Sequence, residues 1–146
     1  MTPEQLVNAA REARTRAHAP YSAFRVGAAL LDEHGGVHLG ANVENASYGL
    51  SCCAERVAVF RAVADGVTRF TQIAVISRGG VAPCGACRQV LNEFAPDLTL
   101  HLADETGPHR TLTLSTLLPE AFGPAQLTAD VAEHASAANP RAARTD

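Results

Sequence analysis

Hydrophobic and polar positions along the chain change period several times, which predicts alternating helices and strands. Residues 3–17 place small and apolar side chains on one face, and Thr2 and Pro3 suit a helix start. Two Ala- and Val-containing segments that begin near cysteines predict further helices over residues 53–64 and 84–94. The first of these ends at Asp65-Gly66, where the glycine suits a helix C-terminus.

Short apolar or alternating segments between the helices predict strands. These segments are residues 24–31, 37–43, 70–76, 98–102 and 110–114. The turn-forming residues 32–36 join the first two strands into an antiparallel hairpin, whereas strands separated by helices require parallel crossovers. The expected fold class is therefore α/β, a three-layer α/β/α sandwich around a mixed, about five-stranded sheet.

Length and composition restrict the possible functions. A chain of 146 residues with 47% hydrophobic residues is expected to form one domain, and a net charge of -3 gives no basic surface for nucleic acid. The N-terminus lacks a signal-peptide pattern and no apolar run is long enough to cross a bilayer, so we expect a cytoplasmic protein with no membrane partner. Residues 1–127 form the expected domain, and the Ala-rich, polar residues 128–146 are expected to be a disordered C-terminal tail.

Three of the four cysteines are the candidate metal ligands. Cys84 and Cys87 lie three residues apart at a predicted helix start and so share a face, and Cys53 opens another helix. In a reducing compartment this spacing favours metal binding or redox chemistry over disulfides. Three thiolates leave one position of a zinc tetrahedron open, which is typical of catalytic zinc, and Glu55 can then act as an acid and base.

Glu55 and Cys53 can serve one site only if both lie in the first turn of their helix, because a spacing of two residues faces opposite sides in mid-helix. Three thiolates around a divalent cation leave a net charge of about -1. Two helix N-termini and Arg56 are the expected counter-charges. A structural zinc site closed by Cys52 is the alternative, although neighbouring residues diverge by about 100° around a helix.

The Cys-x-Glu and Pro-Cys-x-x-Cys pair is the signature of zinc-dependent deaminases. With Cys53-Ala54-Glu55-Arg56 and residues 83–89 in place, the chain closely resembles the small, homotetrameric, zinc-dependent type of cytidine deaminase. The other matching segments are Pro20-Tyr21-Ser22 with Phe24, residues 42–50, Leu117-Leu118-Pro119, and Phe122-Gly123-Pro124.

The resemblance implies a function and a role for each matching residue. It implies hydrolytic deamination of cytidine, and of 2′-deoxycytidine, to uridine or deoxyuridine and ammonia in pyrimidine salvage, with residues 1–127 as the catalytic domain. One Zn²⁺ per subunit would be bound by Cys53, Cys84 and Cys87, and Glu55 would carry protons. The implied substrate contacts are Phe24 on the pyrimidine, Asn42 and Glu44 on ribose hydroxyls, the Ala54 amide on the base edge, and Ala46, Tyr48 and Phe122 reaching a neighbouring subunit's site.

Two alternatives remain open from the sequence. The same metal motif occurs in deaminases of cytosine-nucleoside antibiotics such as blasticidin S, although residues 42–46 favour an unmodified ribose. A non-catalytic, zinc-stabilised assembly module would keep the three cysteines and leave Glu55 without a role. Nucleic-acid editing is disfavoured because no basic, aromatic groove is evident.

Overall fold

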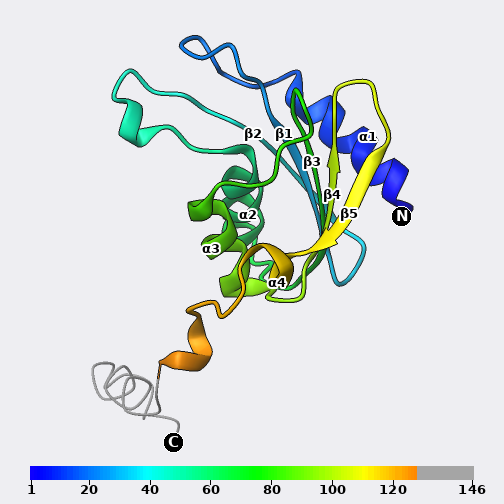
Figure 1. Cartoon of the computed structure of the whole chain (residues 1–146), viewed down its shortest axis with the longest axis vertical. Helices are drawn as coiled ribbons and strands as arrows, with labels where there is room; N and C mark the ends of the chain where they lie inside the picture. The colour runs from blue at the N-terminus through cyan, green and yellow to red at the C-terminus, as the bar shows by residue number, and fades with distance from the viewer. Residues whose placement is uncertain (128–146) are drawn as a thin grey trace, which may run out of the picture.

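The computed structural model of the chain describes residues 1–127 and contains one five-stranded sheet in the order β2-β1-β3-β4-β5 (Figure 1). The predicted tail, residues 128–146, lies outside the described residues. The strands are β1 (Gly27–Asp32), β2 (Val37–Ala41), β3 (Phe70–Ile76), β4 (Thr99–Ala103) and β5 (His109–Thr113). The helices are α1 (Pro3–Arg14), α2 (Ala54–Ala64), α3 (Gly85–Phe94), α4 (Leu114–Leu117) and two single 3₁₀ turns, Tyr48–Leu50 and Pro124–Gln126.

The strand directions make the sheet mixed. β1 pairs antiparallel with β2 and with β3, β3 pairs parallel with β4, and β5 is antiparallel to β4. β2 and β3 therefore run in the same direction on either side of β1, and α2 is the crossover between them. The predicted hairpin and the parallel crossovers are both confirmed.

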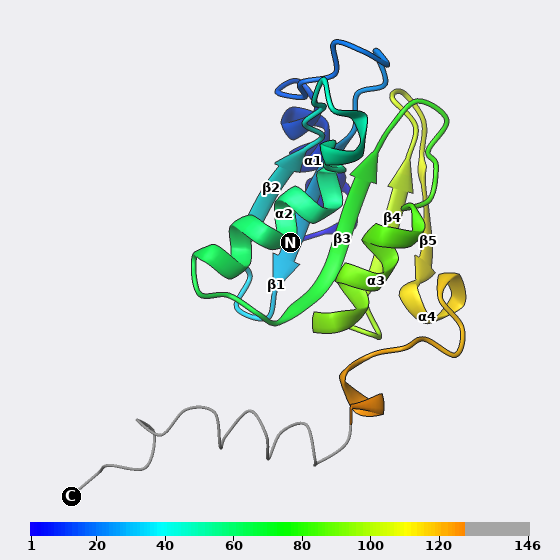
Figure 2. The same cartoon turned by 90° about the vertical axis from the view of Figure 1, so that its left-hand side faces the viewer.

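The two faces of the sheet are covered by different helices. Helix α1 lies on one face, and α2 and α3 lie on the other, as Figures 1 and 2 show. Ala28 and Leu30 of β1 belong to the core under α2 and α3, whereas Ala29 and Leu31 belong to the core under α1. Because side chains alternate along a strand, β1 can be buried at every position. The predicted three-layer α/β/α sandwich is thus confirmed.

Several element ends differ from the sequence-based prediction. Helix α1 starts with the capping box Thr2 and Gln5, but it ends at Arg14 because the next three amides bond to carbonyls three residues earlier, which tightens the turn. Strand β1 starts at Gly27 and not at Phe24. Helix α4 was not predicted, because Leu114 continues the apolar alternation of β5.

The loops that precede α2 lie together at one end of the sheet. Figure 1 shows residues 15–26 and 42–52 at this end, and the segment after α4 at the opposite end. None of the helices within residues 1–127 combines the length and apolar character that a membrane crossing requires.

Candidate active site

Three cysteine sulfurs converge where two helices begin. Cys53 is the N-cap of α2, Cys84 is the N-cap of α3, and Cys87 lies buried in the first turn of α3. The Sγ atoms of Cys53 and Cys84 are 3.8 Å apart, those of Cys84 and Cys87 are 3.5 Å apart, and all three lie within 4.8 Å of one another. Tetrahedral zinc with bonds of about 2.3 Å to sulfur places its sulfurs about 3.8 Å apart, so this donor set fits zinc.

Positive charge surrounds the three sulfurs. Because Cys53 and Cys84 are the N-caps of α2 and α3, the partly positive N-termini of both helices lie at the sulfur cluster. The Nη2 atom of Arg56 donates to Sγ of Cys53 over 3.6 Å, and this hydrogen bond raises the pKa of Arg56. Arg56 therefore remains a cation beside the cluster.

The pKa values of Cys53 and Cys87 are shifted in opposite directions. The pKa of Cys53 is lowered to about 5, first because the Cys87 thiol donates to it and also because Arg56 does. The pKa of Cys87 is raised, because it is the donor to Cys53 and because it is buried. The lowered pKa favours the thiolate form of Cys53, in which a cysteine binds metal. Cys52 is not part of the three-sulfur group within the described residues.

Glu55 is the second residue of α2 and only 4% exposed. Burial raises its pKa to about 7. Its side chain lines a pocket of about 290 Å³, together with Cys53 and Cys84. A spacing of two residues therefore does bring Cys53 and Glu55 to one site, because both lie at the helix N-terminus. A carboxyl group with this pKa can accept and return a proton near neutral pH.

The same pocket includes three of the predicted substrate residues: Phe24, Asn42 and Glu44. Sequence reasoning missed its other lining residues, which are Ser22, Val26, Val75, Val81 and Ala82. The apolar ones have no sequence signal that separates them from core residues. Ser22 does have a sequence signal, because it belongs to the Pro20-Tyr21-Ser22 segment that matches the family.

Asn42 and Glu44 also hold the loop that carries Phe24. The Asn42 side chain donates to the Phe24 carbonyl over 2.8 Å and accepts from the Val26 amide over 2.9 Å. Oε1 of Glu44 accepts from the Tyr21 and Ser22 amides, and Oε2 accepts from the Ser22 hydroxyl. The Ser22 hydroxyl contributes most to the lowered pKa of Glu44. The Asn42 side chain thus occupies the Phe24 carbonyl and the Val26 amide, which a longer β1 would pair with a neighbouring strand, and β1 begins at Gly27.

The remaining predicted contacts do not line this pocket in a single chain. Ala54 is buried in the first turn of α2, and Ala46 lies in the loop before it. Tyr48 is 75% exposed and packs edge-on against Tyr21, with ring centroids 5.6 Å apart. Phe122 is 62% exposed and lies in the segment at the opposite end of the sheet.

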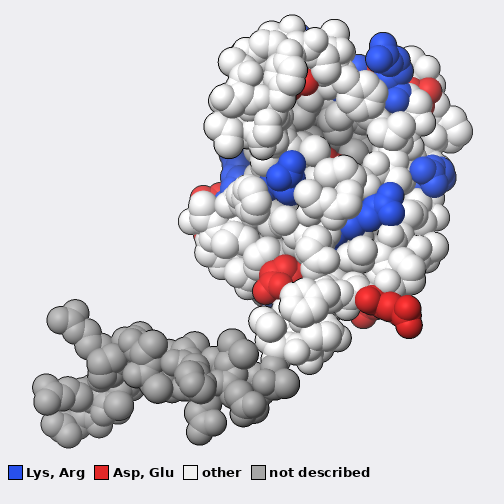
Figure 3. All heavy atoms as spheres, turned by 60° about the vertical axis from the view of Figure 1, so that its left-hand side comes forward, with Lys and Arg blue, Asp and Glu red and all other residues white. Residues whose placement is uncertain are grey.

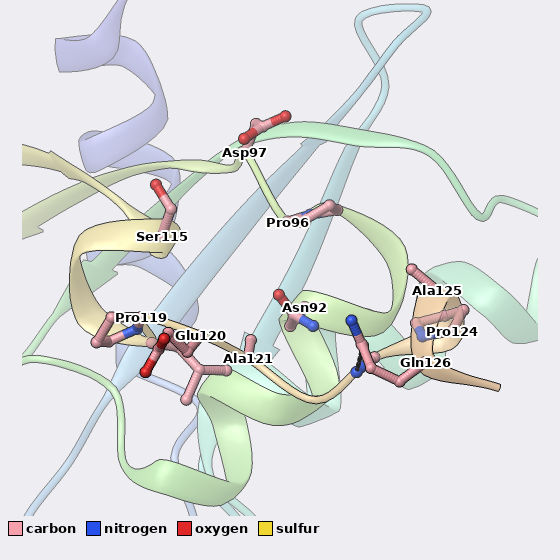
Figure 4. Close-up of a pocket in the computed structure, with 12 residues that line it drawn as sticks. Asn92, Pro96, Asp97, Ser115, Pro119, Glu120, Ala121, Pro124, Ala125 and Gln126 are labelled. Carbon is pink, nitrogen blue, oxygen red and sulfur yellow. Dashed lines mark hydrogen bonds between the residues drawn. The ribbon is translucent and has the colours of Figure 1, made fainter.

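A second hollow of about 310 Å³ lies between α3 and the segment that carries Phe122 (Figure 4). Gln89 and Asn92 of α3 both donate to the Phe122 carbonyl, over 2.6 and 3.3 Å. The Gly123 amide donates to Gln126, which closes a turn beside this hollow. None of the three cysteines lines it, so we assign the hollow to the anchoring of this segment.

Comparisons with known proteins agree with this geometry. The family model described as "Cytidine and deoxycytidylate deaminase zinc-binding region" matches residues 1–101, which include the three cysteines and Glu55. The cytidine deaminases of Sporosarcina psychrophila and Halalkalibacterium halodurans are 46% and 48% identical to the chain over 125 residues. These matches cover 84% of the chain and 92% and 95% of the two relatives.

A solved structure, that of cytidine deaminase from Burkholderia pseudomallei, superposes with a TM-score of 0.81 at 50% identity. The match covers 84% of this chain and all of that chain. The family resemblance and the zinc-binding character predicted from the sequence are both confirmed. The chain therefore belongs to the cytidine and deoxycytidylate deaminase family.

Proposed function

We propose that the protein catalyses the zinc-dependent hydrolytic deamination of cytidine and 2′-deoxycytidine to uridine and deoxyuridine, with release of ammonia, in pyrimidine salvage. The observation that carries this proposal is the position of Glu55. A buried carboxyl group with a pKa near neutrality lines the same pocket as two of the three metal-ligand candidates and Phe24. The named activity of the relatives at 46–50% identity supports the same reaction.

Cys53, Cys84 and Cys87 would hold the zinc, which when bound supplies a Lewis acid that lowers the pKa of water. Glu55 takes a proton from the attacking water and delivers it to N3 of the pyrimidine while the water oxygen adds to C4. Glu55 then passes the second proton of that water to the amino group, which leaves as ammonia. One water is consumed and the C4–N bond is replaced by a C4–O bond.

The proposed substrate contacts are those that the family resemblance implies, and three of the residues, Phe24, Asn42 and Glu44, line the pocket. Phe24 packs on the pyrimidine, the Asn42 and Glu44 side chains bind ribose hydroxyls, and the Ala54 amide faces the base edge. The hydrogen bonds that Asn42 and Glu44 make to the 21–26 loop support this assignment, because they fix the carboxylate, the amide and the aromatic ring as one unit. A fixed arrangement of this kind lowers the entropic cost of binding.

We propose further that the enzyme is a homotetramer whose sites are completed by Ala46, Tyr48 and Phe122 of neighbouring subunits. The support is that Tyr48, Leu50 and Phe122 are each more than half exposed in one chain, where large aromatic and aliphatic side chains favour a partner. Light scattering should give a mass of about four times 15.3 kDa. A monomer with full activity would contradict the shared sites.

The setting of the enzyme is also part of the proposal. We place it in the cytoplasm, because all four cysteines are free and three of them must remain reduced to bind zinc. We assign the catalytic domain to residues 1–127, which hold every proposed site residue. Nucleic acid is not a proposed partner: the basic side chains on the face shown in Figure 3 stand apart and form no continuous patch.

One assay tests the function and separates the alternatives. Loss of the cytosine absorbance and release of ammonia are measured with cytidine, 2′-deoxycytidine and blasticidin S, and zinc is measured in the same sample. The proposal predicts turnover of both nucleosides in zinc-containing protein. Turnover of blasticidin S alone identifies an antibiotic deaminase, and zinc-containing protein without turnover of any of the three indicates an assembly module.

A further inference from the structure

An arginine outside the pocket contacts the ring of Phe24. The Cζ atom of Arg78 lies 5.7 Å from the centroid of the Phe24 ring, within the range of a cation–π contact. Arg78 follows β3, more than fifty residues along the chain from Phe24. Within residues 1–127 it takes part in no ion pair, so Phe24 is the partner that the structure provides for its guanidinium group.

The backbone on both sides of Arg78 is fixed to the end of β4. The buried Ser77 donates its amide to the Ala103 carbonyl over 3.3 Å, and its hydroxyl accepts from the Val81 amide over 3.1 Å. The Gly79 amide donates to the Asp104 carboxylate over 2.9 Å, with Gly79 at a φ of 83°. These hydrogen bonds fix the backbone of the turn from which the Arg78 side chain extends.

Phe24 and Arg78 differ in whether they line the pocket. Phe24 lines the 290 Å³ pocket that also contains Glu55, whereas Arg78 does not line it. The guanidinium group thus contacts the ring without itself lining the pocket. The backbone of Phe24 is held by Asn42, but those bonds leave rotation of its ring about the side-chain bonds unrestrained.

We propose that Arg78 is a positioning residue that holds the Phe24 ring in the orientation in which it packs on the pyrimidine. The inference rests on the proposed function, because it requires that Phe24 contact the nucleoside. Arg78 itself touches neither the substrate nor the zinc ligands. Its loss weakens binding of substrate and transition state alike, which raises KM and leaves kcat nearly unchanged.

The test is a double-mutant cycle on the full-length, zinc-loaded protein. KM and kcat for cytidine are measured for wild type, Arg78→Gln, Arg78→Lys, Phe24→Leu and the Arg78→Gln/Phe24→Leu double variant. Arg110→Gln removes the same charge from an exposed strand position and is the matched control. The dissociation constant for uridine, measured by calorimetry, gives a second readout that does not depend on turnover.

The expected result is a rise in KM of about 2- to 5-fold for Arg78→Gln, the size of an exposed cation–π contact, with kcat within about 2-fold of wild type. Arg78→Lys keeps a cation and recovers most of the affinity. In the Phe24→Leu background, Arg78→Gln has no additional effect, and the dissociation constants for uridine follow the same pattern. Arg110→Gln matches wild type.

Several results would overturn the inference. An unchanged KM in Arg78→Gln means that Arg78 has no role in binding, and an equal rise in the Phe24→Leu background means that it touches the nucleoside directly. An unchanged KM in Phe24→Leu would show that Phe24 does not contact the nucleoside, which the inference requires. A different outcome is that wild type fails to deaminate cytidine while the dissociation constants for uridine still differ between wild type and the Arg78 and Phe24 variants as described. In that case the proposed function fails and the positioning role stands.

Discussion

Gly40 of β2 lies in direct contact with the backbone of Ala54, the first residue of α2. A Cβ atom at position 40 would lie 2.2 Å from the Ala54 carbonyl oxygen and 2.5 Å from the Ala58 amide nitrogen. Any residue larger than glycine must therefore push α2 away from the sheet. Because α2 carries Cys53 at its N-cap and Glu55 in its first turn, this contact sets the height of both groups above the sheet.

Replacing Gly40 by alanine should therefore damage both the fold and the site. We expect the free energy of unfolding in urea to fall by about 1–3 kcal/mol, the usual cost of overpacking, and zinc content and kcat to fall with it. Gly107→Ala is the control, since a Cβ there meets only Asp104 at 3.8 Å, an ordinary contact. Wild-type stability and activity in Gly40→Ala would contradict the proposed spacing.

Ser22 links Glu44 to the Phe24 backbone. Its hydroxyl donates to Glu44 and accepts from the Phe24 amide over 2.9 Å. Ser22→Ala should raise KM for cytidine about 2- to 10-fold, the range for losing one net hydrogen bond. The pKa of Glu44 should also rise toward its ordinary value in the variant. As the pH is lowered, KM of Ser22→Ala should therefore start to increase at a higher pH than KM of wild type.

The control for this experiment is Ser115→Ala, an exposed serine on α4. Steady-state kinetics between pH 4.5 and 8 measure both effects. Identical KM values and pH profiles for Ser22→Ala and wild type would show that the Ser22 bond does not set the position or charge of Glu44.

Asp32 stabilises the hairpin between β1 and β2. Its Oδ1 atom accepts from the His34 and Gly36 amides, and Oδ2 lies 2.9 Å from Nε2 of His38. The His38 hydrogen bond is the largest cause of a pKa lowered to about 2, from an ordinary value of 3.8. A carboxylate with a lowered pKa stabilises the fold above its unfolded pKa and loses this effect as the pH falls.

Asp32→Asn should thus be less stable than wild type at pH 7, and the difference should shrink as the pH falls from about 4 toward about 2. Urea unfolding at pH 7, 5, 4 and 3 measures the difference, with the exposed Asp97→Asn as control. A difference that is constant across this range would mean that the charge of Asp32 contributes nothing.

Zinc binding predicts how many cysteine thiols react with a thiol reagent. The chain has four cysteines, of which Cys53, Cys84 and Cys87 are the proposed ligands. Native zinc-loaded protein should therefore react with a thiol reagent at no more than one site, Cys52, where burial raises the pKa and slows the reaction, and at four sites after a chelator removes the metal. Zinc released into a colorimetric dye should equal one ion per chain. Four fast thiols in zinc-loaded protein would contradict the assigned ligands.

Much of the fold followed from the sequence because its signals are local. Strand β3 was predicted with the observed limits, Phe70–Ile76, because its apolar run stands between clear breaks. The three cysteines could be placed at two helix starts for the same reason. Helix α4 could not be predicted, since four residues are too few to establish a helical period.

The contacts that orient the site were not predictable in the same way. Arg78 meets Phe24, and Gly40 meets Ala54, only after β1, β2 and β3 have been assembled into one sheet. Neither pair has a spacing that marks it in the sequence. The roles of Asn42 and Glu44 in holding the 21–26 loop depend equally on the hairpin that brings residues 42–44 back beside residues 21–26.

The Glu55→Gln substitution tests most directly whether Glu55 carries protons beside a zinc held by three cysteines. Turnover of cytidine and zinc content are measured on the same preparations of wild type, Glu55→Gln and Glu93→Gln, an exposed control with the same substitution. We predict one zinc per chain in all three proteins, wild-type turnover in Glu93→Gln, and a loss of at least about 10²-fold in kcat for Glu55→Gln. Zinc-loaded Glu55→Gln that deaminates cytidine at a rate near that of wild type would contradict this role of Glu55.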